Sequence, residues 1–156
     1  MEKLIVPAQW LKEHLHDEDV VILDASQPTS IGTQAIPGAR PFDIKNEFSE
    51  KSSDLPNTFP TAAHFEKKCR ELGINRSSTI IVYDSRGIFS SPRVWWMFKV
   101  MGHQNVLVLD GGLPAWNKAG FMTEDLAAYS GPIGDFNAEL DTDRIKDLRF
   151  VQENIE

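Results

Sequence analysis

The stretch Thr79–Asp110, TIIVYDSRGIFSSPRVWWMFKVMGHQNVLVLD, decides the fold of this chain. Its first five residues are mostly β-branched or aromatic, which predicts a strand buried on both faces of a parallel sheet. Ser91 is a candidate N-cap and Pro92 suits the first helical turn, so a helix should begin there and end at Gly102. Val106–Leu109 predicts a second buried strand. Strand, helix and strand together form a βαβ unit.

The loop between the first strand and the helix is the predicted functional site. In open α/β sheets, ligands bind beyond the carboxyl ends of the strands. A loop that leads into a helix also presents free backbone N–H groups to anions. The loop consists of Asp84, Ser85, Arg86, Gly87, Ile88, Phe89 and Ser90. It contains no cysteine, and Cys69, the single cysteine of the chain, lies elsewhere.

Composition narrows the class of protein. A length of 156 residues with 41% hydrophobic residues predicts one globular domain, with room for a short tail. The net charge of −7 argues against a nucleic-acid partner and against binding to anionic membranes. One cysteine excludes an internal disulfide and a cysteine-based metal cluster, so we predict neither metal nor cofactor. The N-terminus has the features of neither a signal nor a transit peptide, and we expect a cytoplasmic protein.

Other segments predict the remaining parts of an α/β domain. Local patterns indicate a helix after Pro7, a strand at Val20–Leu23, a Pro-Gly turn at Pro37, a helix from Thr61 to Gly73 and a short helix at Leu113–Ala119. The polar stretch Phe42–Asn57 predicts a long surface excursion, and Tyr129–Gly134 has the composition of a linker. Asp141–Glu156 is charged and amphipathic, and nothing follows that would cover its apolar face.

Several motifs carry a resemblance to a known family. They are Val21–Ser26 (VILDAS), Ile36–Arg40 (IPGAR), Tyr83-Asp84, Ser91–Met97 (SPRVWWM) and Leu109–Trp116 (LDGGLPAW). Together they resemble the rhodanese family, and more narrowly the N-terminal domain of the two-domain thiosulfate and 3-mercaptopyruvate sulfurtransferases. The resemblance covers roughly residues 4 to 140.

The resemblance implies an α/β fold, with a central, mostly parallel sheet and helices on both faces. Residues 1–140 would form the rhodanese-like N-terminal domain, and residues 141–156 an interdomain linker and the start of a second domain. In such proteins the C-terminal rhodanese domain of the same polypeptide carries the catalytic cysteine. That cysteine takes sulfane sulfur from a small anionic donor and passes it to a thiophilic acceptor such as cyanide or a thiol.

Carried over residue by residue, the resemblance places Asp84 at the catalytic-cysteine position and Gly87 at the loop glycine. Phe89 would then face the active site of the partner domain. The chain departs from the family at Gln34-Ala35, where Gly-His is usual, which affects the expected local turn and the hydrogen bonding of Asp24. On this interpretation the chain is inactive alone and helps to form the crevice between the domains.

Asp84 and Cys69 each allow a second interpretation. The Asp84 carboxylate could act as a nucleophile of a hydrolase, but a structural role is favoured, in which it accepts loop N–H bonds or pairs with Arg86 or Arg93. Cys69 could carry a persulfide, although its spacing with Phe65 on a predicted helix favours a buried, inert thiol. A third possibility is a non-catalytic rhodanese-like binding or regulatory module.

The remaining polar and aromatic candidates have ordinary interpretations. Arg86 could attract an anionic substrate or remain a solvated loop residue. Of Trp95 and Trp96, one should lie in the core and the other at a contact surface. The four histidines are interpreted as surface or cap residues, because they show no metal-ligand spacing: His14, His16, His64 and His103.

Overall fold

The structure is a computed structural model, and it describes residues 4–26, 31–43 and 61–139. Residues 44–57 of the predicted surface excursion lie outside the described residues. So does the predicted tail, Asp141–Glu156.

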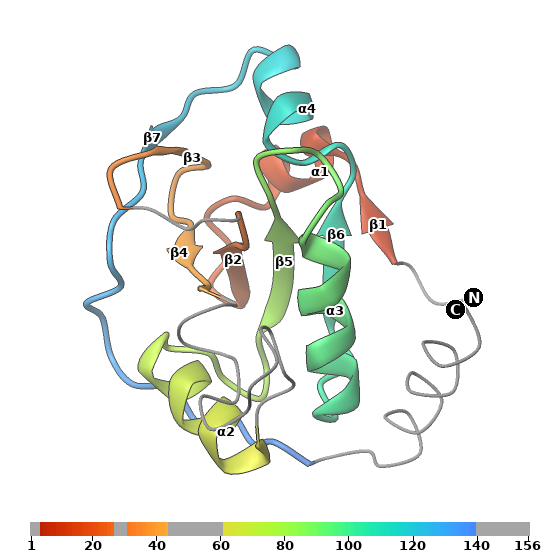
Figure 1. Ribbon diagram of the computed structural model, residues 1–156. Coiled ribbons are helices and arrows are strands. Elements are labelled where there is room, and N and C mark those ends of the chain that lie inside the picture. Colours follow the sequence, from red (N-terminus) through yellow and green to blue (C-terminus); the bar gives the residue numbers. More distant parts are fainter. Residues whose placement is uncertain (1–3, 27–30, 44–60, 140–156) are drawn as a thin grey trace, which may run out of the picture.

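A central sheet of five parallel strands organises the described part of the chain (Figure 1). Its strands stand in the order β1-β6-β5-β2-β4, so that β5 lies at the centre. The bounds are Ile5–Val6 for β1, Val20–Asp24 for β2, Arg40–Pro41 for β4, Thr79–Tyr83 for β5 and Val106–Leu109 for β6. The predicted strands at the two ends of the βαβ unit are therefore confirmed. A separate antiparallel pair joins β3 (Gln34–Ala35) to β7 (Glu124–Asp125).

Four helices flank the sheet in the described residues, as the predicted α/β class requires (Figure 1). They are α1 (Ala8–Glu13), α2 (Ala62–Glu71), α3 (Ser91–Val100) and α4 (Gly112–Lys118). Thr61 caps α2 as predicted, because its Oγ1 accepts the backbone N–H of His64 at 3.2 Å.

Alternation along the strands sends side chains to two separate cores. Val21 and Leu23 of β2 pack into a cluster that includes residues of α2 and α3. Ile22, between them, packs on the opposite face into a cluster that includes residues of α1 and α4. Successive side chains of a strand point to opposite faces, so a run of buried residues is what a sheet covered on both sides needs.

Four phenylalanines form the centre of the first core: Phe42, Phe65, Phe98 and Phe136. The Phe65 and Phe98 ring centroids are 5.0 Å apart, and Phe136 lies 5.8 Å from Phe98. Phe42 is fully buried, so the surface excursion predicted from this residue onward does not include it. The composition around Phe42 is polar, but this one side chain has enough apolar area to enter the core.

The segment after β7 is attached to the domain. The sequence pattern predicted a linker at Tyr129–Gly134, but the N–H of Gly134 donates to the Arg70 carbonyl at 2.8 Å. The N–H of Phe136 donates to the Ile74 carbonyl at 3.0 Å, and its ring is fully buried. The segment therefore contributes to the folded core through residue 136, well beyond the predicted linker.

His103 is a buried residue, and its prediction as a surface or cap residue is wrong. Its side chain is 7% exposed, and its Nε2 lies 2.8 Å from the Ser78 carbonyl oxygen. Burial lowers the pKa of His103 and the nearby Lys99 charge lowers it further, although the bond to Ser78 acts in the other direction. The imidazole follows the C-terminal turn of α3 and closes the core beside Phe98.

Candidate functional site

The loop that joins β5 to α3 lies at the carboxyl end of the central strand. The side chains of Ser85, Arg86, Ile88 and Phe89 are exposed, whereas those of Asp84 and Ser90, like the glycine Gly87, are buried. The loop therefore exposes four of its seven residues to solvent and buries the other three.

Asp84 is the centre of this loop. Its carboxylate is 1% exposed and accepts four backbone N–H groups. Oδ1 accepts from Arg86 at 2.9 Å. Oδ2 accepts from Phe89 at 2.9 Å, from Ser90 at 3.0 Å and from Ser91 at 2.9 Å. The loop folds around its own carboxylate.

These hydrogen bonds fix the charge state of Asp84. Burial alone would raise the pKa of the carboxyl group, but the N–H groups of Phe89, Ser91 and Arg86 act in the other direction, and the net pKa is lowered. No ion pair joins the carboxylate to Arg86 or Arg93 in the described part of the chain. Of the structural roles predicted for Asp84, the observed one is the acceptance of loop N–H bonds.

The N-terminus of α3 is capped by Asp84. The helix begins at Ser91 with Ser90 as its N-cap, one residue earlier than predicted, and Pro92 takes the second position. Ser90 makes no capping bond, because its Oγ donates to the Ala25 carbonyl. The Asp84 carboxylate accepts the first helical N–H group instead, where the helix dipole also favours a negative charge.

Two glycines allow the loop to pack against the turn that leads into α4. Gly87 has φ of 109°, a conformation that favours glycine. A Cβ on Gly112 would lie 2.5 Å from the carbonyl oxygens of both Asp84 and Gly87. The N–H of Leu113 donates to the Asp84 carbonyl at 3.1 Å. The Gly111-Gly112 turn thus supports the loop from the outside.

The outward side of the loop combines apolar surface with a positive charge. Ile88 is 49% exposed and Phe89 57% exposed. The Arg86 guanidinium lies over the Phe89 ring, 4.5 Å from its centroid. Large apolar side chains exposed together in this way are a feature of contact surfaces.

A second buried aspartate lies at the end of the neighbouring strand β2. The Tyr83 hydroxyl donates to Asp24 Oδ2 at 2.8 Å, and the Ser26 N–H donates to Oδ1 at 2.9 Å. The Ile36 N–H donates to the Tyr83 oxygen at 3.2 Å. Burial raises the pKa of Tyr83, and the charge of Asp24 raises it further. Asp24 has these partners although Gln34-Ala35, which forms β3, departs from the family pattern.

Cys69 takes the structural role that the sequence favoured, whereas neither tryptophan lies fully in the core. Cys69 is fully buried on α2, and burial raises the pKa of its thiol well above the usual value. A neutral buried thiol is a poor nucleophile. Trp95 and Trp96 are both half-buried with ring centroids 6.4 Å apart, and Trp95 packs against the first core.

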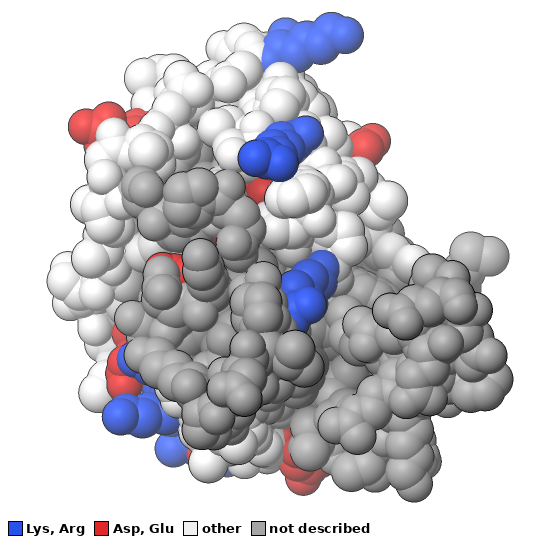
Figure 2. Space-filling view, in the orientation of Figure 1, with Lys and Arg blue, Asp and Glu red and all other residues white. Residues whose placement is uncertain are grey.

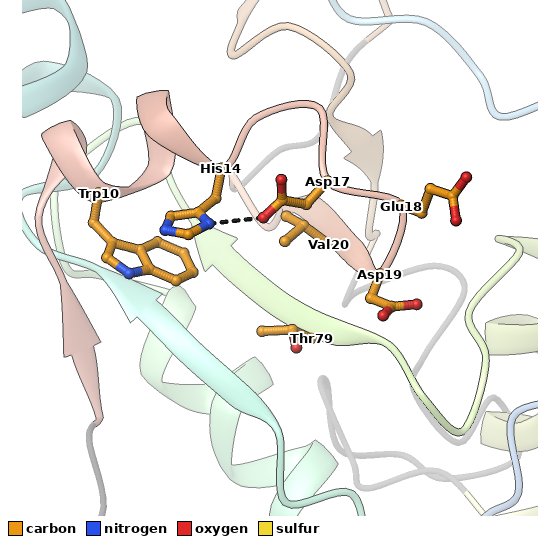
Figure 3. A pocket seen from close by; sticks show the side chains of 7 residues that line it. All are labelled: Trp10, His14, Asp17, Glu18, Asp19, Val20 and Thr79. Carbon is orange, nitrogen blue, oxygen red and sulfur yellow. Dashed lines mark hydrogen bonds and ion pairs between the residues drawn. The ribbon is translucent and has the colours of Figure 1, made fainter.

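A hollow of about 450 Å³ lies at the opposite end of the sheet, where β2 and β5 begin (Figure 3). The His14 ring stacks on Trp10 at 4.1 Å, and its Nδ1 lies 2.7 Å from Asp17 Oδ2. The sequence analysis did not predict this hollow, since its lining comes from two distant segments. Its lining is Trp10, His14, Asp17, Glu18, Asp19, Val20 and Thr79.

The residues described here offer few alternatives to the loop as a site. They hold no group of three His, Cys, Asp or Glu side chains that could bind a metal ion. None of their helices is long and apolar enough to cross a membrane. The hollow carries carboxylates and an imidazole but no thiol or hydroxyl other than Thr79. The loop after β5 remains the candidate that both sequence and geometry support.

Comparison with known proteins identifies the family. The sequence pattern of the rhodanese-like domain matches residues 7–119. The chain belongs to the rhodanese-like domain family. The fold agrees, because the chain superposes with a TM-score of 0.82 on the crystal structure of a 3-mercaptopyruvate sulfotransferase from Escherichia coli. That match has 32% sequence identity and covers 97% of this chain and 62% of the other.

Curated relatives of this rhodanese-like domain are sulfurtransferases. The chain is 41% identical over 133 residues to thiosulfate/3-mercaptopyruvate sulfurtransferase 1, mitochondrial, of Arabidopsis thaliana, covering 80% of this chain and 35% of that protein. It is 35% identical over 150 residues to the 3-mercaptopyruvate sulfurtransferase of Escherichia coli, covering 90% of this chain and 53% of the relative. For the human 3-mercaptopyruvate sulfurtransferase the identity is 34%, with 99% and 56% covered. The chain spans about half the length or less of these relatives.

Proposed function

We propose that this chain is the non-catalytic N-terminal domain of a two-domain sulfurtransferase. The whole polypeptide would transfer sulfane sulfur from thiosulfate or 3-mercaptopyruvate to a thiophilic acceptor such as cyanide or a thiol. Its partner is the C-terminal rhodanese domain of the same polypeptide. Support comes from relatives that are sulfurtransferases and are about twice as long as the part that this chain matches.

The Asp84 carboxylate is the single observation that carries this proposal. Sulfane sulfur transfer requires a thiolate that can form a persulfide, and an aspartate cannot replace it. Asp84 occupies the loop where a thiol would be needed, and its oxygens already accept four N–H groups. Cys69 is fully buried with a raised pKa, so it offers no substitute.

The work of the domain is then to complete the active site of its partner. Ile88 and Phe89 supply an apolar wall that needs a covering surface, and Arg86 places a positive charge beside it. Small sulfur donors such as thiosulfate are anions, and a guanidinium lowers the energy of an anion in a partly closed crevice. The Asp84 carboxylate holds the loop from within through its bonds to the backbone N–H groups.

The same hydrogen bonds argue against an aspartate-based hydrolase. A nucleophilic carboxylate must expose an oxygen to its substrate. The Asp84 carboxylate is 1% exposed, and both of its oxygens accept hydrogen bonds. We therefore expect no magnesium-dependent phosphatase activity from the chain.

The experiment that tests the proposal is a sulfurtransferase assay of the full-length protein, with thiosulfate or 3-mercaptopyruvate as donor and cyanide as acceptor. We expect turnover by the full-length protein that is lost when the cysteine of the second domain is replaced by serine. The 156-residue chain alone should give none. A full-length protein without such a cysteine and without turnover would instead favour a rhodanese-like binding or regulatory module. We further propose a cytoplasmic location, which fractionation of cells would test; one relative is named as mitochondrial.

A further inference from the structure

Residues 85–109 form the longest stretch of the chain without an aspartate or glutamate. This stretch holds three cations, Arg86, Arg93 and Lys99, in a chain whose net charge is −7. Lys99 is 1% exposed and its Nζ donates to the Gln104 carbonyl at 2.8 Å. Its charge is therefore buried and is not presented to solvent. The two arginines are exposed. The loop after β5 and the first turn of α3 therefore present positive charge on an acidic protein.

Neither arginine has a carboxylate partner among the residues that the structure describes. No ion pair joins Arg86 or Arg93 to an acidic side chain of residues 4–26, 31–43 or 61–139. Partial burial lowers the pKa of Arg93, and no nearby carboxylate acts against it. Asp110, the acidic residue that follows β6 at the same end of the sheet, makes no ion pair with either arginine.

Arg86 lies against an exposed aromatic ring, and Arg93 follows that ring closely in the chain. The Arg86 guanidinium lies 4.5 Å from the centroid of Phe89. The backbone of Ser90 is helical, with φ of −101° and ψ of −17°, and α3 follows directly. Arg93 lies in the first turn of α3, four residues after Phe89, and is exposed. Figure 2 shows Lys and Arg side chains over this loop and over α3.

Four backbone N–H groups at this loop already have an acceptor within the protein. The N–H groups of Arg86, Phe89, Ser90 and Ser91 all donate to the Asp84 carboxylate. The Ser90 hydroxyl donates to the Ala25 carbonyl. These four N–H groups are therefore not available to an anion, whereas the guanidinium groups of Arg86 and Arg93 are exposed.

We propose that Arg86 and Arg93 together form a rim of two guanidiniums that selects for a doubly charged sulfur donor. The inference rests on the proposed function and adds to it a second recognition residue, Arg93, and a preference between donors. Thiosulfate carries two negative charges, whereas 3-mercaptopyruvate with a neutral thiol carries one. Coulomb energy is proportional to the charge of the donor, so loss of an arginine harms thiosulfate more.

The test is steady-state kinetics of the full-length protein with each donor. The variants are Arg86→Gln, Arg93→Gln and the double substitution, with Lys67→Gln as a matched loss of one exposed charge on α2. Each arginine variant should lower kcat/KM for thiosulfate by about five-fold at low salt, and kcat/KM for 3-mercaptopyruvate by about two-fold, the square root of that factor. Arg93→Lys retains the positive charge and should keep kcat/KM for thiosulfate close to that of the wild type. In all of these variants kcat should change little.

The possible outcomes separate the two proposals. Equal kinetics of Arg93→Gln and Lys67→Gln would overturn the rim while the sulfurtransferase stands. Equal losses for both donors would overturn the preference for a dianion. Salt of about 0.5 M should shrink the effects, because exposed charges are screened. A wild-type protein that turns over neither donor would refute the proposed function, and the rim with it.

Discussion

The two ends of the parallel sheet use acidic residues in opposite ways. At the carboxyl end, Asp84 is buried and its oxygens accept four backbone N–H groups. At the amino end, Asp17 borders an open hollow of about 450 Å³ and pairs with the half-exposed His14 (Figure 3). The amino end has an exposed ion pair beside its hollow, whereas the carboxyl end has a loop that is organised around its own buried carboxylate. The proposed site thus rests on the organisation of polar groups and not on the volume of a hollow.

The largest contrast should come from removing the two aspartates. Asp84→Ala leaves buried N–H groups without an acceptor, and each such group costs about 1–3 kcal/mol, so we expect a loss of about 3–5 kcal/mol in the free energy of unfolding. Asp17→Ala breaks an exposed pair and should cost about 0.5 kcal/mol. Urea unfolding of the two variants measures both values. Similar losses would contradict the contrast.

The next largest loss of stability should come from disturbing the contact between the loop and the turn before α4. Gly112→Ala places a Cβ 2.5 Å from two backbone carbonyl oxygens, which should cost about 3 kcal/mol. Gly120→Ala is the matched control, because Gly120 also has positive φ but has no atom within 4 Å of the new Cβ. It should cost about 1 kcal/mol from backbone strain alone. Thermal melting compares the two, and equal shifts would show that the loop moves away freely.

Acid should affect the carboxyl end through Asp84. The pKa of Asp84 is lowered in the folded state, so below the ordinary value of 3.8 the unfolded chain binds the proton first. The stability from its loop bonds is present above that value and is lost as pH falls through the lowered folded pKa. The urea midpoints of the wild type and of Asp84→Asn should therefore become more similar as the pH is lowered from 5 through the folded-state pKa of Asp84. A difference between the two midpoints that stays the same at every pH would show that ionised Asp84 is not the source of the acid sensitivity.

The smallest effect concerns His103, near the amino end of the sheet. Its pKa is lowered from 6.5, so the unfolded chain takes up the proton first as pH falls below that value, and stability is lost. His103→Gln should show a weaker dependence of stability on pH between 7 and 5 than the wild type. Chemical denaturation at several pH values measures this slope. If His103→Gln has the same dependence of stability on pH as the wild type, a group other than His103 causes that dependence.

Local patterns were sufficient for the elements around the loop. The β-branched run at Thr79–Tyr83 and the apolar run at Val106–Leu109 have the bounds predicted for them. Thr61 caps α2 because capping needs only residues three positions apart. The Gly111-Gly112 turn was likewise visible, since positive φ at both residues is a local requirement.

What the sequence did not reveal depends on distant partners. Ser91 was predicted to cap α3, but Asp84, seven residues earlier, accepts its N–H group. His103 looked polar enough for the surface, but its imidazole bonds the distant carbonyl of Ser78, which makes burial less costly. Phe136 follows a stretch with the composition of a linker, and its burial depends on rings from α2 and α3. Spacing alone carries no signal for such pairs.

The most direct test of the account is the intact mass of the 156-residue chain after incubation with thiosulfate or 3-mercaptopyruvate, with and without cyanide. Asp84 cannot form a persulfide and Cys69 is buried with a raised pKa, so the mass should stay unchanged under all conditions. A gain of one sulfur that cyanide removes would place a persulfide on Cys69. The central claim, that this loop supports sulfur transfer without carrying the sulfur, would then be wrong.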